Sequence, residues 1–110
     1  MKVTELGALE ELVLLITASI GEQAYAVQIK EEVEQQSGRS FNISSIHTTL
    51  FRLEEKKFLS SEMGEPTAER GGRRKRYFVL TTQGIQALSQ ARELRNRLWD
   101  LIPERIINKG

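Results

Sequence analysis

Residues 70–76 read Arg-Gly-Gly-Arg-Arg-Lys-Arg, and five of these seven residues are cationic. They separate two short segments rich in apolar and β-forming residues, 58–63 and 77–80. Gly64 and Pro66 lie between the same two segments and favour a loop. The pattern predicts a β-hairpin with a long basic tip, which suits the phosphate backbone of a nucleic acid.

Two helices are expected near the N-terminus, because apolar residues recur there at steps of three and four. Thr4 is the expected N-cap of the first helix, and Gly21 should end it. The second helix should span residues 24–36, with Gly38 after its end. The residues expected to face inward are Leu6, Leu9, Val13, Ile16, Ile20, Val27, Ile29 and Val33.

A third helix should begin at Ser44 or Ser45 and reach about residue 56. Its expected buried stripe consists of Ile46, Leu50 and Leu53. The opposite face should present only polar and cationic side chains and no acidic one, and comprises Ser45, Thr48, Thr49, Arg52 and Lys56.

A last helix should follow the hairpin, capped by Thr81 or Thr82 and ended or kinked by Pro103. Its apolar residues repeat at steps of four and three, which is typical of a helix–helix seam. The seam consists of Ala87, Ala91, Leu94, Leu98 and Leu101, widened by Leu88, Trp99 and Ile102.

This order of elements predicts a mainly α fold with a small β-hairpin. Residues 1–81 would form a winged helix-turn-helix, and residues 82–110 a C-terminal dimerisation helix with its tail. A unit of this size cannot bury the apolar stripe of the last helix alone, so we expect a homodimer in which Leu94, Leu98, Trp99, Leu101 and Ile102 meet the partner.

Composition restricts the functional classes. The 110 residues suffice for one small domain, the net charge is only +1, and there is no cysteine. No apolar run is long enough for a membrane span, and the N-terminus lacks the order of a signal peptide. We therefore expect a soluble cytoplasmic protein without a membrane partner.

The third helix and the basic loop together predict contact with double-stranded DNA. Helix N-termini and hydroxyl side chains suit phosphates and base edges, and arginine can pair with guanine or enter a minor groove. The expected DNA-binding residues are Tyr25, Ser44, Ser45, His47, Thr48, Thr49, Arg52, Arg70, Arg73, Arg74, Lys75 and Arg76. Two symmetric copies would bind a palindromic operator.

Several of these residues have alternatives. The outward face of the third helix, like the basic loop, could simply be solvated. Tyr25 could hydrogen-bond a phosphate or only pack, and His47 could contact DNA or pack beside Phe51. Trp99 could belong to the dimer core or form a flat wall for a planar small-molecule effector.

No enzyme constellation is present in the sequence. His47 is the only histidine and cannot build a zinc site alone. Glu54 and Glu55 are adjacent, so on a helix they diverge by about 100°. No metal, cofactor or catalytic residue is expected.

Separated motifs resemble the PadR family of bacterial transcriptional regulators. They are Leu-Gly-Ala-Leu-Glu-Glu-Leu-Val-Leu-Leu at 6–15, Ala-Tyr at 24–25, Thr-Leu-Phe-Arg-Leu-Glu-Glu-Lys at 49–56, Glu-Pro at 65–66, Glu-Arg-Gly-Gly-Arg-Arg-Lys-Arg-Tyr at 69–77, and Leu-Thr at 80–81 with Gly84. The resemblance implies a winged helix with a C-terminal dimerisation helix. Members of the family are mostly repressors that bind palindromic operators and release them in response to a small molecule or stress signal.

The chain departs from the family pattern at three positions. His47 stands where the family often has tyrosine, and Ala26 and Lys57 stand where it has glycine. Lys57 should therefore adopt a positive φ at some energetic cost. Two rivals to a DNA-binding regulator are a winged-helix protein-interaction adaptor, using the acidic first helix, and an RNA or single-strand binder, for which aromatic residues are scarce.

Overall fold

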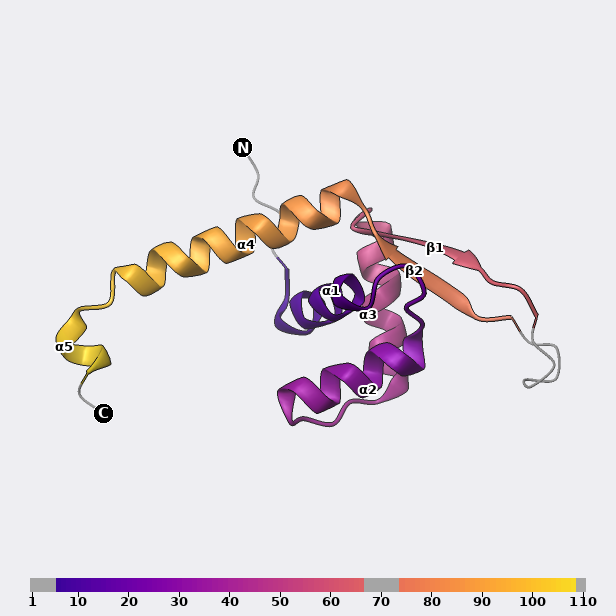
Figure 1. The fold of residues 1–110 in the computed structure, drawn as a ribbon, viewed down its shortest axis with the longest axis horizontal. Helices are drawn as coiled ribbons and strands as arrows, with labels where there is room; N and C mark the ends of the chain where they lie inside the picture. Colours follow the sequence, from indigo (N-terminus) through magenta and orange to yellow (C-terminus); the bar gives the residue numbers. More distant parts are fainter. Residues whose placement is uncertain (1–5, 67–73, 109–110) are drawn as a thin grey trace.

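The computed structural model describes residues 6–66 and 74–108 and confirms a mainly helical fold with one hairpin. Three helices pack together, a two-stranded hairpin projects from them on one side, and a long helix leads away on the other (Figure 1). Thr4, Arg70 and Arg73 lie outside the described residues. The elements are α1 (Ala8–Ile20), α2 (Ala26–Ser37), α3 (Ile43–Glu55), β1 (Leu59–Met63), β2 (Arg76–Leu80), α4 (Thr82–Asp100) and α5 (Glu104–Ile107).

The expected ends of the first three helices agree with the structure to within two residues, except at the start of α1. That helix begins at Ala8 after Gly7, three residues later than a Thr4 cap requires. The side chain of Glu10 makes an upstream cap unnecessary, because its Oε1 accepts a hydrogen bond from the Gly7 amide at 2.7 Å. Gly21 ends α1 and Gly38 ends α2, both with positive φ.

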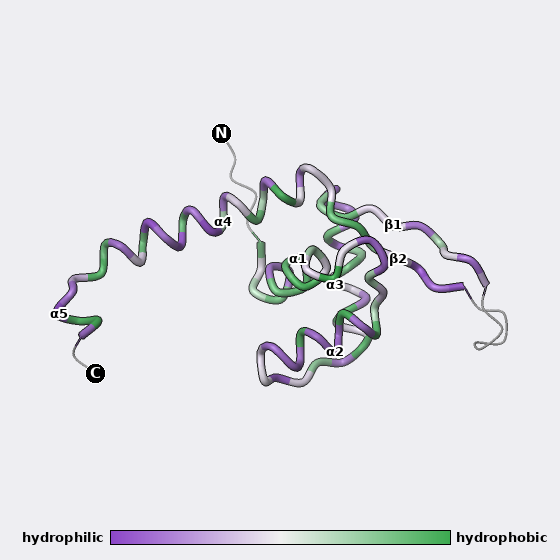
Figure 2. The backbone as a smooth tube through the Cα atoms, viewed as in Figure 1, coloured by the Kyte–Doolittle hydropathy of each residue, from purple (hydrophilic) through white to green (hydrophobic). Residues whose placement is uncertain are grey.

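The core lies where α1, α2 and α3 meet the base of the hairpin, and hydrophobic residues concentrate there (Figure 2). Ile46, Leu50 and Leu53 are fully buried, as expected. The inward placement of Val27 was wrong, since its side chain is 46% exposed. Val27 lies two residues before the buried Ile29, about 200° around the helix, so the two cannot face the same side.

The hairpin is joined to the helical body along its inner strand. β1 and β2 pair antiparallel from Leu59 opposite Leu80 to Met63 opposite Arg76. On its other edge, β2 bridges to the α1–α2 connection, where the Phe78 amide donates to the Ala24 carbonyl at 2.8 Å. The base of the wing is therefore attached to the segment that connects α1 and α2.

The turn from α3 into β1 confirms the positive φ expected for Lys57, which has a φ of 67°. The Phe58 amide donates to Leu53 O and the Lys57 amide to Glu54 O, both at 2.9 Å. This is a Schellman motif, whose left-handed position normally carries glycine.

The same turn fixes the start of α4. The hydroxyl of Thr81 donates to Lys57 O at 2.6 Å and accepts from the Gly84 amide at 3.0 Å, so Thr81 is the N-cap. A Cβ on Gly84 would lie 2.3 Å from Phe58 O, which explains why glycine is needed at this close approach. Pro103 separates α4 from α5, as expected of a helix-ending residue.

We expect Lys57→Gly to raise the free energy of unfolding by about 0.5–1 kcal/mol, because glycine adopts this conformation without steric cost. Urea denaturation followed by circular dichroism measures the change. Glu55→Gly, in regular helix two residues earlier, is the matched control and should be destabilising. Equal or lower stability of Lys57→Gly would contradict this explanation of the turn.

Candidate nucleic-acid interface

The outward face of α3 is polar, as the sequence predicted, although some residues at its edges differ from expectation. Ser44, His47, Thr48 and Arg52 are exposed, and Ser45 is half-buried. The helix begins directly after Asn42, so its N-terminal amides lie beside the exposed serine. This end of α3 combines free hydroxyls with the positive end of a helix dipole, which favours phosphate oxygens.

The outward placement of Thr49 was wrong. Its side chain is buried, and its hydroxyl donates to the Ser45 carbonyl at 2.8 Å. Thr49 lies three residues after Ile46 and four before Leu53, so it belongs to the edge of the buried stripe. We therefore remove Thr49 from the candidate contact residues.

Two charged residues near the end of α3 also differ from expectation. The Lys56 Nζ lies 2.9 Å from Glu10 Oε1 of α1, so this ammonium is directed toward α1 rather than outward. Glu55 is exposed and lies seven residues after Thr48, which places it on the same face two turns on. The outward face thus carries one carboxylate, at the end opposite the N-terminal hydroxyls.

Phe51 was missing from the predicted site and lies on the same face. Its side chain is 47% exposed, and its ring stacks on the His47 ring with centroids 6.1 Å apart and planes 23° apart. The spacing of Thr48, Phe51 and Glu55 could have revealed this position. Arg39, also missed, lies in the turn before α3 with its guanidinium 5.1 Å from the centre of the Phe41 ring.

Glu34 holds the turn that sets the direction of α3. Its carboxylate accepts from the Phe41 amide at 2.8 Å and from Lys30 Nζ at 3.1 Å. The hydrogen bond from the Phe41 amide, reinforced by Lys30, lowers the pKa of Glu34 below its ordinary range.

Each described cation of the wing is oriented by a neighbouring group. Arg74 Nε donates to the Gly64 carbonyl at 2.8 Å, and Lys75 Nζ lies 4.0 Å from the centre of the Tyr25 ring. Arg76 Nη1 donates to the Ser61 hydroxyl at 2.9 Å. These contacts orient the charged ends of the three side chains at the end of the hairpin opposite its Leu59–Leu80 base.

Tyr25 has a packing role at this position. Its ring meets the Tyr77 ring edge-on at 6.3 Å and supports the ammonium of Lys75 on its face. A Cβ on Gly64 would lie 2.3 Å from the Tyr77 ring, so glycine allows Tyr77 to cover the first strand there. A phosphate contact by Tyr25 stays a prediction.

A chain of hydrogen bonds connects the wing to α3. Arg76 donates to Ser61, and Ser61 in turn donates to Glu54 Oε2 at 2.6 Å. Because Ser61 is in β1 and Glu54 is in the last full turn of α3, β1 lies beside this helix and links it to Arg76 on β2. The two candidate surfaces are therefore neighbours in the folded chain.

The acidic residues of α1 are engaged inside the fold. Burial alone would raise the pKa of Glu10. Hydrogen bonds from Lys56 and the Gly7 amide, together with the charges of Lys56 and Arg52, outweigh this effect, so the pKa is lowered overall. Glu11 pairs with Arg95 of α4 at 2.7 Å and raises the pKa of that guanidinium.

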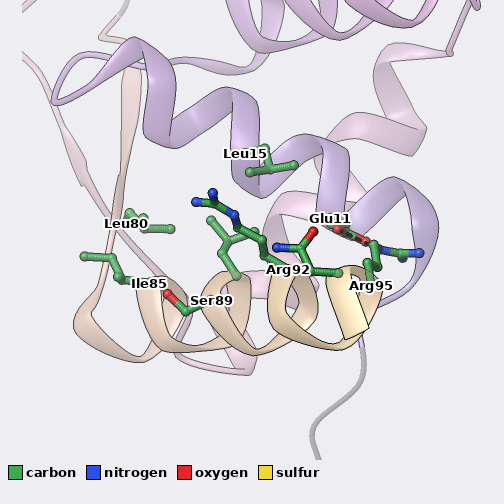
Figure 3. A pocket seen from close by; sticks show the side chains of 9 residues that line it. Glu11, Leu15, Leu80, Ile85, Ser89, Arg92 and Arg95 are labelled. Carbon is green, nitrogen blue, oxygen red and sulfur yellow. Dashed lines mark hydrogen bonds and ion pairs between the residues drawn. The ribbon is translucent and has the colours of Figure 1, made fainter. Parts of the chain in front are cut away.

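A hollow of about 440 Å³ lies between α1 and α4, and its apolar floor has a cationic edge (Figure 3). Its lining consists of Glu11, Leu15, Leu80, Ile85, Leu88, Ser89, Arg92, Arg95 and Asn96. Trp99 is not part of this lining. The hollow and the aromatic surface that was expected to bind a planar effector are therefore two separate sites on α4.

Farther along α4, the predicted apolar seam is open to solvent in a single chain. Leu94 is 46% exposed, Leu98 54%, Trp99 59% and Leu101 75%. Ile102, beyond the end of α4, is half-buried. In Figure 1 this part of α4 extends away from the three-helix body.

A family model described as the transcriptional regulator PadR-like family matches residues 14–90, which is most of the chain. The chain belongs to this family. The match spans α2, α3 and the hairpin completely, together with the second half of α1 and the first half of α4. No curated protein sequence matches the chain closely enough to count as a relative.

Solved structures share the PadR-like fold. The chain is similar to a PadR-like transcription factor from Bacteroides fragilis, with 25% identity, a TM-score of 0.70, and 84% of each chain covered. RosR of H. salinarum is 21% identical with a TM-score of 0.70, covering 94% of this chain and 86% of that one. A PadR-like regulator from Bacillus cereus is 18% identical with a TM-score of 0.69 and 86% coverage of each chain.

The described residues contain neither a metal-binding cluster nor a membrane-spanning helix. Within residues 6–66 and 74–108, no group of three or more histidine, cysteine, aspartate or glutamate side chains could hold a metal ion. Over the same ranges, no helix is long and apolar enough to cross a membrane.

We expect Glu34→Gln to lower stability at neutral pH, with a difference from the parent that shrinks as the solution is acidified. The folded-state pKa of Glu34 is lowered, so its contribution is present above the ordinary glutamate pKa of about 4.3 and is lost as pH falls through the lowered value. Urea midpoints at several pH values test this. Glu31→Gln, exposed on the same helix, is the control, and a pH-independent difference would contradict the assignment.

Proposed function

We propose that this PadR-like chain binds duplex DNA in a sequence-specific manner. The outward face of α3 would enter the major groove, and the wing cations would grip flanking phosphates or the minor groove. The observation that carries the proposal is the chain of hydrogen bonds from Arg76 through Ser61 to Glu54, which connects the basic strand to α3 through β1. Arg70 and Arg73, in the same basic run, would add to this surface.

Charge distribution supports DNA over the adaptor alternative. Glu10 and Glu11, the acidic pair of α1, form ion pairs with Lys56 and Arg95, so their charges are partly neutralised within the fold. The wing residues Arg74 and Arg76 are exposed, with hydrogen bonds to a carbonyl and a hydroxyl rather than to a carboxylate. The strongest outward field is therefore positive and suits a polyanion.

The active form would be a homodimer. The exposed apolar side chains Leu94, Leu98, Trp99 and Leu101 follow one another along α4, and a second copy of the helix would remove them from water. Residues 1–81 would then act as the DNA-binding unit and residues 82–110 as the dimerisation unit. Two recognition helices about one helical turn, or roughly 34 Å, apart would require an inverted-repeat operator.

We further propose that the regulator acts as a repressor and that a small-molecule effector releases it. Occupying an operator is sufficient for repression, and the chain has no described site for enzymatic chemistry. The proposed effector contact is Trp99, which is 59% exposed in a single chain, so that a planar effector would compete with the partner helix for its aromatic face.

We expect the chain to enrich an inverted repeat from a random pool of DNA duplexes and to bind it above bulk competitor DNA. For the enriched duplex, Arg74→Ala should reduce the slope of log affinity against log salt by about 1.8, since one phosphate contact is lost from each of two subunits. Fluorescence anisotropy across a salt series measures the slope.

Arg97→Ala is the control for the salt measurement, because it removes the same charge from the last turn of α4, far from the hairpin. An unchanged slope for Arg74→Ala would remove Arg74 from the interface. Absence of any sequence preference in the parent would favour the adaptor.

We expect Leu98→Asp to convert the dimer into a folded monomer and to weaken operator binding at least tenfold, because a carboxylate cannot be buried in an apolar seam without a partner. Light scattering reports the mass and circular dichroism the fold. Val27→Asp places the same charge at a side chain of similar exposure on α2 and should leave the dimer intact. A monomeric parent, or a dimeric Leu98→Asp, would refute the proposed seam.

A further inference from the structure

The exposed ring of Phe51 has no packing role in the core. Ile46, Leu50 and Leu53 already fill the inner side of α3 and are fully buried, whereas Phe51 is 47% exposed. A phenylalanine left in water on a short helix forgoes the free energy that burial would give it. The ring is therefore available for a contact outside the chain.

The ring is held in one place by its neighbour. His47 lies one turn earlier, and the two rings stack with centroids 6.1 Å apart. A side chain already restricted by such a contact loses less rotamer freedom when it binds. The pair is thus prepared for a partner in the conformation seen here.

The location of the pair points to the DNA groove. Phe51 follows Thr48 by three residues, so it lies on the same outward face as the hydroxyls. Glu54 follows His47 by seven residues and is hydrogen-bonded to Ser61 of the wing, so the ring pair occupies the wing side of that face. An apolar ring here lies between the hydroxyls of α3 on one side and β1 of the wing on the other.

Duplex DNA offers one apolar group on its major-groove edges, the C5 methyl of thymine. We propose that Phe51, positioned by His47, reads a thymine methyl in each operator half-site and is a specificity-determining residue. The inference rests on the DNA-binding function proposed above and adds to it a base preference at one symmetric position.

The test uses the full chain and a duplex that the parent has enriched from a random pool. Each symmetric pair of thymines is replaced in turn by deoxyuridine, which removes only the methyl groups. Removing one buried methyl should weaken binding roughly fourfold, so a symmetric pair should cost roughly fifteenfold in affinity. We expect this loss at one position, measured by anisotropy at fixed salt.

Phe51→Ala links the effect to the ring. This variant should bind the thymine duplex about as weakly as the parent binds the deoxyuridine duplex, and it should no longer distinguish the two at that position. Its melting temperature should match that of the parent, because the side chain is half exposed. Val27→Ala, at 46% exposure on α2, should retain the full thymine preference.

The possible outcomes are separable. If the parent binds its operator but no thymine replacement weakens binding, or if Phe51→Ala keeps the preference, this inference is wrong and the DNA-binding function stands. If Phe51→Ala binds DNA normally and instead loses a protein partner, the ring is a protein contact and the inference is also wrong. If the parent enriches no duplex at all, both proposals fail together.

Discussion

The arrangement of the molecule depends on the turn that follows α3. There, the carbonyls of Lys57 and Phe58 both accept hydrogen bonds from Thr81, at 2.6 and 3.0 Å. Gly84 lies directly against the Phe58 carbonyl, where no side chain would fit. One short turn thus positions α3, the hairpin and α4 relative to one another. The left-handed conformation of Lys57 is the cost of this geometry.

The charged residues that stabilise the fold are different from the cations proposed to bind a ligand. The glutamates Glu10, Glu11, Glu34 and Glu54 hold helices, turns and strands in place. The cations of the wing are aligned by hydroxyl, carbonyl and aromatic groups, which leave their charge largely uncompensated. A net charge of +1 for the chain therefore understates the local field.

Local signals in the sequence predicted most of the fold. Apolar spacing identified the buried stripe of α3, and Gly21, Gly38 and Thr81 marked helix ends, because these features depend on residues close in the chain. The family resemblance predicted the positive φ of Lys57, and the turn geometry explains it.

Errors arose where distant residues decide the outcome. Lys56 is turned by Glu10, 46 positions away. Phe51 is a different case, because its spacing from Thr48 already places it on the outward face. The inward placement of Val27, the outward placement of Thr49 and the exclusion of Glu55 from the outward face of α3 were errors in assigning residues to the sides of a helix.

The length of α4 converts small rotations into large displacements. Its 19 residues rise about 28 Å, so a tilt of about 10° at Thr81 moves the far end by about 5 Å. In a twofold assembly, the two DNA-binding units would separate or approach by a comparable amount. A small change in the packing of α4 against α1 would then be enough to move both units out of the DNA grooves, whose spacing is fixed by the duplex.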